Sequence, residues 1–392
     1  MPDLGPLLTP RPQELEELVR GLHAAATPWC PAGLGHHAHW GPPLQQPCTL
    51  VSTRHLNRIR DHAVGDFTVT VEAGLSLAAL QQALAAADQW LPVDPPLAGD
   101  GSIGGIIARG LGGRLRHRYM GLRDQLIGIE LIAADGTLAR AGGRVVKNVA
   151  GYDLMRLFCG SWGSLGLITA VTLRTQPLPR QRRRLAAVGP AADLALLRQR
   201  LLLESPLSLE LLDWQQSAAA VPRLLIGLVS LDAMALACQE EVLRELLPAG
   251  LSLTEVDPVA DPGTDPGTPD RRIPPGSWLL RPAVPPVQAL DLLTDPAARG
   301  WSLQLGAASG LGLAEADFTT ADDAAVDALR SLCRQRGGLL TILQAPPACR
   351  LPAWHDAPAR VLIEAVKRQF DPLGQLAPGR LPGVQSPKAA TV

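Results

Sequence analysis

Three histidines lie close together in the stretch PAGLGHHAHWGPP, at positions 36, 37 and 39. Imidazole nitrogens are common metal ligands, so one interpretation of this spacing is a metal site. A metal site would need further histidine, cysteine or carboxylate ligands, and no acidic residue or cysteine lies between positions 31 and 47. The sequence therefore favours a polar loop that binds no metal.

Three glycine-rich stretches predict a site for a large anionic ligand. They are residues 33–41, 99–113 and 160–166, and each lies beside a predicted strand. Glycine inside ordered structure is costly, so it marks a positive φ or a close approach by another group. Backbone N–H groups gathered in turns and at helix N-termini bind anions, and a cofactor with two phosphates fits that need. The alternative is that all three stretches are ordinary turns.

Two familiar nucleotide motifs are not supported. Gly33-x-Gly35-x-x-Ala38 matches a dinucleotide-binding pattern in its spacing. That pattern must open a long helix, which Pro42 and Pro43 prevent. The chain also contains no G-K-[ST] sequence, which argues against a nucleoside-triphosphate loop.

Hydrophobic periodicity and turn residues predict the elements that position these loops. Asp135-Gly136 is expected to form the turn of a hairpin over residues 125–140, and Ser76 is expected to cap the helix that follows it. Proline-flanked QPLPRQRRR, residues 176–184, is interpreted as a basic linker, and residues 257–272 as a polar loop. We predict helices over 11–25, 54–61, 77–87, 152–159, 235–247, 324–337 and 359–370, and strands over 48–53, 67–72, 167–174, 224–231 and 339–345.

Composition places the chain among globular proteins. It has 392 residues, of which 46% are hydrophobic and 19% charged, with a net charge of −1. Such a charge gives no strong attraction to nucleic acid or an anionic membrane. We find neither a signal segment nor a membrane span in the sequence. None of the six cysteines has C-x-x-C spacing, which argues against an iron–sulfur cluster or structural zinc and favours a cytoplasmic chain with reduced thiols.

The order of these motifs resembles a known family. The PAGLGHH loop, FTVTVEAGLSLAALQQAL, LPVDPP, GSIGGIIARG and GSWGSLGLIT follow one another as in the PCMH-type FAD-binding domain of the vanillyl-alcohol oxidase and para-cresol methylhydroxylase superfamily. RVVKNVAGYDL and VKRQFDPLGQLAPGRLPG further resemble the FAD-binding subunit of bacterial glycolate oxidase. The resemblance covers residues 31–177 and 361–383 and is thin over 185–345.

This resemblance implies an α+β fold in three parts. Residues 1–180 would form the FAD-binding domain, built from two subdomains with the cofactor between them. Residues 181–345 would form a smaller cap domain, an antiparallel sheet with helices on one side, and residues 346–392 would return to the FAD domain. The FAD-contacting residues would be Ala32, Gly33, Leu34, Gly35, His36, His37, Gly101, Ser102, Gly104, Gly105, Ala108, Gly112, Gly163, Gly166 and Ile168.

The family suggests a further role for His36 and roles for three other positions. His36 occupies the place where some members bond the flavin covalently, so a covalent link is one alternative and a polar loop residue the other. Lys147 and Asn148 lie in the family-specific block; Lys147 would place a charge near the flavin or a partner, or be a surface lysine. Ala377 stands where the family usually has asparagine before Pro-Gly, so a hydrogen bond expected there is missing.

No catalytic residue is evident. A flavin that oxidises a 2-hydroxy acid needs a base for the hydroxyl proton and a cation for the carboxylate. The sequence has no histidine cluster beyond residue 180, where only His355 is found. The resemblance therefore implies the FAD subunit of a multi-subunit glycolate oxidase, which converts glycolate to glyoxylate. A separate catalytic flavin subunit and an iron–sulfur subunit would be its partners, and the complex would lie in the cytoplasm or at the inner membrane.

Two alternatives follow from the same observations. One is a self-sufficient FAD-dependent 2-hydroxy-acid dehydrogenase. The other is a scaffold subunit that has lost FAD, which the replacement of a usual glycine by Leu34 would favour.

Overall fold

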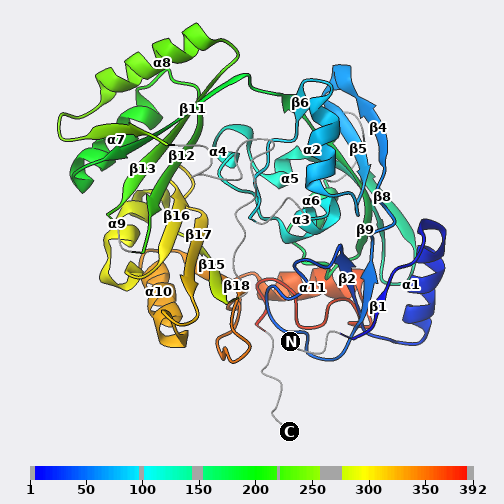
Figure 1. The fold of residues 1–392 in the computed structure, drawn as a ribbon. Helices are drawn as coiled ribbons and strands as arrows, with labels where there is room; N and C mark the ends of the chain where they lie inside the picture. Colours follow the sequence, from blue (N-terminus) through cyan, green and yellow to red (C-terminus); the bar gives the residue numbers. More distant parts are fainter. Residues whose placement is uncertain (1–4, 97–100, 144–152, 219–220, 257–275, 386–392) are drawn as a thin grey trace. The chain divides into compact units, whose positions relative to one another are not determined.

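The computed structural model describes residues 5–96, 101–143, 153–218, 221–256 and 276–385. The chain divides into two compact units (Figure 1). Unit 1 contains residues 1–112, 121–177 and 352–392, and unit 2 contains residues 113–120 and 178–351.

Unit 1 is built on two main sheets. A parallel three-stranded sheet has the order β1 (Leu7–Leu8), β3 (Thr49–Ser52), β2 (Trp29–Gly33), and α1 (Leu15–Ala24) follows β1 in the chain. An antiparallel five-stranded sheet has the order β4 (Ile59–Ala63), β5 (Thr68–Glu72), β9 (Leu167–Arg174), β7 (Leu126–Ile132), β8 (Leu138–Gly142). The short pair β6 (Gln89–Trp90) and β10 (Gln176–Pro177) completes the strands.

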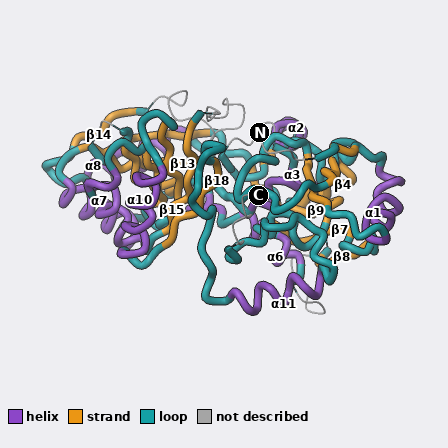
Figure 2. The backbone as a smooth tube through the Cα atoms, turned by 90° about the horizontal axis from the view of Figure 1, so that it is seen from below, coloured by secondary structure: helices purple, strands orange, loops and turns teal. Residues whose placement is uncertain are grey.

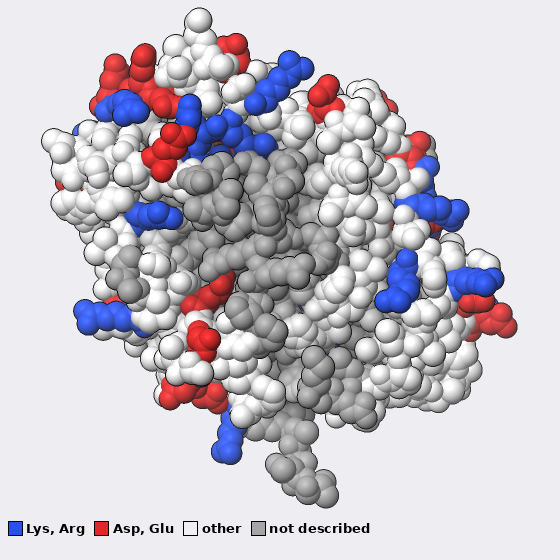
Figure 3. All heavy atoms as spheres, in the orientation of Figure 1, with Lys and Arg blue, Asp and Glu red and all other residues white. Residues whose placement is uncertain are grey.

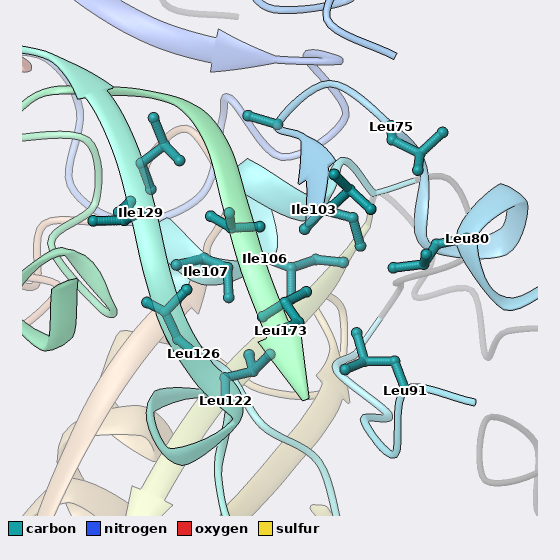
Figure 4. Close-up of a cluster of buried hydrophobic side chains, with 14 of the residues drawn as sticks. Leu75, Leu80, Leu91, Ile103, Ile106, Ile107, Leu122, Leu126, Ile129 and Leu173 are labelled. Carbon is teal, nitrogen blue, oxygen red and sulfur yellow. The ribbon is translucent and has the colours of Figure 1, made fainter. Parts of the chain in front are cut away.

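Helices of unit 1 cover the five-stranded sheet with an apolar core. They are α2 (Leu77–Ala85), α3 (Ile103–Arg109), α5 (Leu122–Gln125) and α6 (Met155–Phe158). Figure 4 shows Ile106 of α3, Leu126 of β7 and Leu173 of β9 pointing into one cluster. Burial of apolar surface on this scale is the main force that holds α3, and the residues around it, against the sheet.

The C-terminal helix α11 (Arg360–Phe370) belongs to unit 1. The Lys367 ammonium donates to the carbonyl oxygens of Ser164 at 2.7 Å and Leu376 at 2.8 Å, and it pairs with Asp371. Phe370 packs edge-on against Phe158 of α6, with ring centroids 5.5 Å apart. These contacts fasten the C-terminal segment beside the third glycine-rich stretch.

Several predictions for unit 1 are confirmed. The strand at 167–174 is β9, the hairpin is β7 and β8, and Ser76 caps α2 by accepting a hydrogen bond from Ala79 N–H at 3.2 Å. The predicted helix over 152–159 is shorter, because α6 spans Met155–Phe158, and Tyr152 lies outside the described residues.

The predicted helix over 54–61 is wrong. Residues 54–56 form a turn, and β4 begins at Ile59 and pairs with β5. The reason lies on the partner strand: Glu72, whose side chain is buried, accepts hydrogen bonds from the Arg58 backbone N–H and from the Arg58 and Arg60 guanidiniums. Pairing at a distance thus overrides the local preference of this stretch.

Unit 2 is an antiparallel eight-stranded sheet with helices along one side (Figures 1 and 2). α7, α8, α9 and α10 pack on it, whereas the short α4 (Arg116–Tyr119) contacts β12. The helices are α7 (Ala191–Leu203), α8 (Ala233–Leu246), α9 (Ala289–Thr294) and α10 (Asp323–Gln335). The strand order is β14 (Ser252–Glu255), β11 (Gln181–Val188), β13 (Arg223–Ser230), β12 (Leu209–Gln216), β16 (Ser302–Gly306), β17 (Gly312–Asp317), β15 (Ser277–Ala283), β18 (Leu339–Gln344).

The basic linker predicted over 176–184 is also corrected, because residues 181–184 begin β11. Glu210 on β12 is fully buried and accepts from Arg184 Nη2 at 2.6 Å and from Arg182 Nε at 3.1 Å. The Tyr119 hydroxyl donates to the same carboxylate at 3.2 Å. The arginines that suggested a solvated linker are therefore partners of a buried acid, and Tyr119 joins the 113–120 segment to the same acid.

Two further observations concern the charges on the surface and the length of the helices. On the face drawn in Figure 3, basic and acidic side chains are interspersed rather than gathered by sign. Within the described part of the chain, no helix is both long and apolar enough to cross a membrane. The polar loop predicted over 257–272 and the block containing Lys147 and Asn148 lie outside the described residues.

Candidate functional site

A single cavity in unit 1 gathers the glycine-rich stretches. Its empty space of about 990 Å³ includes the open solvent at its mouth. Its walls come from β2 and the loop after it, from Gly101 to Leu111, from residues 162–168 and from the C-terminal segment. Segments far apart in the sequence therefore meet at one place.

Every site residue named from the sequence lines this cavity except Gly112. Gly112 follows α3, and the nearest atom that a Cβ added there would meet is the Leu122 nitrogen, at 3.9 Å. The predicted site residues that line the cavity are Ala32, Gly33, Leu34, Gly35, His36, His37, Gly101, Ser102, Gly104, Gly105, Ala108, Gly163, Gly166 and Ile168. Sequence reasoning did not single out Cys30, Trp40, Arg109 or Trp162, which line it as well.

The loop after β2 is shaped by left-handed glycines. Gly33 and Gly35 have φ of +55° and +88°, values that L-residues rarely adopt. Gly35 N–H donates to the Ala32 carbonyl at 2.7 Å, and Ala38 N–H donates to the Gly35 carbonyl at 3.2 Å. The chain thereby turns twice within a few residues and presents Leu34 and His36 to the cavity.

The second glycine stretch does not offer the amides expected of it. Ser102 caps α3 by accepting from Gly105 N–H at 3.2 Å, while Ile103 N–H and Gly104 N–H donate to the Leu75 and Ala73 carbonyls, each at 2.8 Å. The first amides of α3 are therefore used within the protein. We expected amides from three turns to converge on an anion, and at residues 103–105 that expectation is wrong.

Close approach by the protein itself explains several of the glycines. A Cβ on Gly104 would lie 2.7 Å from the Ala73 Cβ, and one on Gly163 would lie 3.3 Å from the Pro31 ring. A Cβ on Gly166 would lie 3.1 Å from Leu131 Cδ1. These glycines allow α3 and the residues before β9 to pack closely against neighbouring segments. They therefore shape the cavity walls through packing within the protein.

Two arginines give the cavity its charge. Arg109, on α3, donates from Nη2 to the His37 carbonyl at 2.5 Å and from Nη1 to the Trp40 carbonyl at 3.4 Å. Its guanidinium lies 4.1 Å from the centroid of the Trp162 ring. Arg380, 3% exposed, donates from Nε to the Pro42 carbonyl at 3.0 Å. The spacing of Arg109 four residues after Gly105 is the signal that could have placed it on the same helix face.

Loss of hydration, together with repulsion from Arg380, lowers the pKa of Arg109 to about 9. Burial raises the pKa of the Cys30 thiol, although the two arginines oppose that rise. Neither arginine forms an ion pair with a described residue, and the described lining contains no Asp or Glu. Among the described lining residues, the site therefore carries positive charge without a carboxylate counter-charge.

The histidines divide between two positions. His36 and His37 line the cavity, and the His37 ring packs against the Trp40 ring at a centroid distance of 4.3 Å. His39 is not among the lining residues. No group of three or more His, Cys, Asp or Glu residues that could hold a metal ion occurs in the ranges that the structure describes.

Ala377 has an unusual backbone conformation, and Asp153 forms an ion pair. Ala377 is buried with φ of +44°, and its N–H donates to the Trp29 carbonyl at 2.8 Å. A left-handed conformation is one that asparagine tolerates better than alanine, which fits the family preference at this position. Asp153 pairs with Arg156 at 3.1 Å at the start of α6.

Comparison with protein families identifies the first part of the chain. Residues 8–142 match the family model described as FAD binding domain. These residues form an FAD-binding domain. The predicted resemblance, the α+β fold and the FAD cofactor are thereby confirmed.

Curated relatives share this FAD-binding domain. The chain is 32% identical over 187 residues to the glycolate oxidase subunit GlcD of Bacillus subtilis, which covers 47% of this chain and 40% of that protein. It is 35% identical over 169 residues to the glycolate oxidase subunit GlcE of Escherichia coli, covering 43% and 48%. It is 35% identical over 170 residues to the probable mitochondrial D-lactate dehydrogenase of Danio rerio, covering 43% and 34%. The matches span less than half the length of each relative.

Solved structures extend the likeness of fold beyond the FAD-binding domain. Alkyldihydroxyacetonephosphate synthase aligns with a TM-score of 0.68 over 96% of this chain and 77% of that one. The sequence identity is 15%, so the likeness concerns the fold alone. The fold therefore continues through unit 2, where sequence resemblance is thin.

Proposed function

We propose that the cavity of unit 1 holds FAD without a covalent bond, and that the chain is the FAD subunit of a multi-subunit 2-hydroxy-acid oxidase acting on glycolate. The observation that supports FAD most directly is the pair of cavity arginines with no acidic partner among the described residues. A diphosphate supplies the missing negative charge, and the apolar side chains of Ile106, Leu111 and Ile168 suit a ring system.

FAD, when bound, would accept two electrons and pass them on. The residues of this chain would hold and orient it. Arg109 and Arg380 would balance its charge, while the left-handed Gly35 would allow the backbone to lie close to it. Trp40 and Trp162, both nearly buried, would exclude water from one wall.

The small number of possible catalytic bases in the cavity supports a relay role for this chain, rather than oxidation of substrate by this chain alone. Among described lining residues, the histidines are His36 and His37, and both lie on the loop after β2. Relatives named as glycolate oxidase subunits support a complex, in which a catalytic flavin subunit and an iron–sulfur subunit would be partners. We place the complex in the cytoplasm, reaching the inner membrane only through those partners.

A second candidate function is a self-sufficient FAD-dependent 2-hydroxy-acid dehydrogenase. It is favoured by the position of His37 on the cavity and by similarity to proteins named D-lactate and D-2-hydroxyglutarate dehydrogenase. Turnover of D-lactate or glycolate by the isolated chain, with a dye acceptor, at the rate of an intact complex would establish this alternative and contradict the relay role.

Absorption spectra of the purified chain before and after acid precipitation test the cofactor assignment. We expect flavin bands in the native protein and a colourless pellet, with the flavin released to the supernatant. A yellow pellet would show a covalent bond and point to His36. Colourless protein that cannot be reconstituted with FAD would favour a scaffold subunit and contradict the proposal.

A further inference from the structure

We propose that Arg109 and Arg380 form a two-charge anion site that recognises a diphosphate, and that this site decides cofactor affinity. The inference rests on the proposed function in one respect, because it takes that diphosphate to be the one in FAD. It assigns the recognition of charge to two side chains, where the glycine-rich sequence had suggested backbone amides.

Charge balance is the first observation. Both guanidiniums line one cavity, Arg380 is almost fully buried, and Arg109 is partly buried. Burying a cation without a counter-charge is costly, and such groups in proteins are normally paired. The described residues supply no carboxylate to either arginine. An anion bearing about two charges would balance the pair, and a diphosphate ester has that charge at neutral pH.

Fixed geometry is the second observation. Arg109 is held by the His37 and Trp40 carbonyls and by the Trp162 ring, and Arg380 is held by the Pro42 carbonyl. A guanidinium carries five N–H donors, so these bonds leave others for a ligand. Because these contacts hold Arg109 at several points and Arg380 at its Nε, less side-chain freedom would be lost when an anion binds.

The used amides of α3 are the third observation. Ile103, Gly104 and Gly105 donate their backbone hydrogens within the protein, so this helix start cannot serve as the main anion cradle. From α3, the positive charge that a ligand meets in this cavity therefore comes from the Arg109 side chain rather than from the first amides of the helix. A site of this kind should respond to the number of ligand charges and to salt more strongly than one made of amides.

The test begins with the full-length chain stripped of flavin, titrated in a calorimeter at pH 7.5 and low salt. The probes are inorganic pyrophosphate, inorganic phosphate, FAD and riboflavin. We expect pyrophosphate to bind and to compete with FAD, phosphate to bind at least tenfold more weakly, and riboflavin binding to be insensitive to pyrophosphate. Failure of pyrophosphate to bind or to compete would overturn the inference.

Variants then assign the charges. Arg109→Gln and Arg380→Gln should each weaken the binding of FAD and of pyrophosphate by at least tenfold. The affinity for riboflavin should stay within twofold of that of the native chain. Arg123→Gln, an exposed arginine on α5, is the matched control and should behave as the native chain. Arg109→Lys keeps the charge and loses the planar fork, so it should restore part of the affinity for pyrophosphate.

The outcomes separate this inference from the proposed function. Native affinity for FAD in both glutamine variants would refute the arginine site and leave the FAD assignment intact. Binding of pyrophosphate but not of FAD by the native chain would refute the proposed function and leave the anion site intact. Should a glutamine variant lose its fold by circular dichroism, the lysine variant and the native competition experiment decide the result.

Discussion

At the scale of single residues, unit 1 treats its buried charges in two opposite ways. Glu72 is enclosed by the Arg58 and Arg60 guanidiniums, whereas Arg109 and Arg380 face a cavity whose described lining has no acid. The first arrangement satisfies its own charge and serves stability. The second leaves charge available, and such uncompensated groups are typical of binding sites.

Replacing Glu72 with glutamine tests the first arrangement. Burial alone would favour the neutral acid, but hydrogen bonds from Arg58 and Arg60 outweigh it and hold the pKa of Glu72 below its ordinary value of 4.5. A depressed pKa stabilises the fold above the unfolded value, and this stabilisation is lost as pH falls through the folded value. Glu72→Gln should therefore cost about 2 kcal/mol in the free energy of unfolding at pH 7, and less at acidic pH.

Urea unfolding at several pH values, with Glu16→Gln as control, measures this effect. Glu16 forms an exposed pair with Arg20, so its loss should change stability by less than about 0.5 kcal/mol at every pH. A Glu72→Gln penalty that stays constant down to pH 3 would contradict the role given to the ionised carboxylate.

Thiol reactivity provides a second residue-scale prediction. All six cysteines are free; Cys238 is exposed on α8, whereas Cys48 and Cys333 are buried. Desolvation raises the pKa of Cys48 to about 11 and that of Cys333 to about 12. Because the thiolate is the reactive form, Cys238 should be labelled first by an aromatic disulfide at pH 8. Cys238→Ser should remove the fastest phase, and an unchanged fast phase would contradict this.

At the scale of elements, the position of α3 depends on a glycine contact. Gly104 packs against Ala73, where an added Cβ would lie 2.7 Å from the Ala73 Cβ and 3.0 Å from its carbonyl oxygen. The helix brings Ser102, Gly105 and Arg109 to the cavity, so its distance from β5 sets the cavity's shape. Packing of one small residue thus controls several site residues together.

Gly104→Ala should lower the free energy of unfolding by about 1–3 kcal/mol, because α3 must move outward or strain. Gly21→Ala in α1 is the matched control, since nothing lies within 4 Å of its added Cβ. That control should raise stability by about 0.5–1 kcal/mol through helix propensity. Thermal and urea unfolding of both variants measure the difference, and a neutral Gly104→Ala would show that the contact is not tight.

At the scale of the whole molecule, the cavity draws its described lining from unit 1 alone. Three separate parts of the chain supply unit 1, and the eight-stranded sheet of unit 2 is inserted between the second and the third. A ligand bound in the cavity should therefore stabilise residues that are distant in sequence. It should leave the stability of α7 and α8, in unit 2, unchanged.

Hydrogen exchange with and without FAD tests this division. We expect the greatest added protection in residues 30–41 and 101–110, with clear protection near 162–168. Peptides from α7 and α8, in unit 2, should exchange at the same rate in both states. Equal protection of α7, α8 and the cavity residues would contradict a site held by unit 1 alone.

The sequence determined much of the local structure and the identity of the cofactor domain. Alternation at residues 67–72 and the Asp-Gly turn at 135–136 specify strands through side-chain direction and turn geometry, which depend on near neighbours. The order of the glycine stretches along the chain carries the resemblance to FAD-binding domains. Those signals are short in range, so a sequence shows them directly.

Only the tertiary structure decided what depends on distant partners. Residues 54–61 form a strand edge because Glu72 holds Arg58, and residues 181–184 begin a strand because buried Glu210 needs two arginines. The roles of Arg109 and Arg380 were hidden for the same reason: a guanidinium is a partner or a free charge according to which acids lie near it in space. Electrostatic energy depends on distance and burial, and one-dimensional spacing fixes neither.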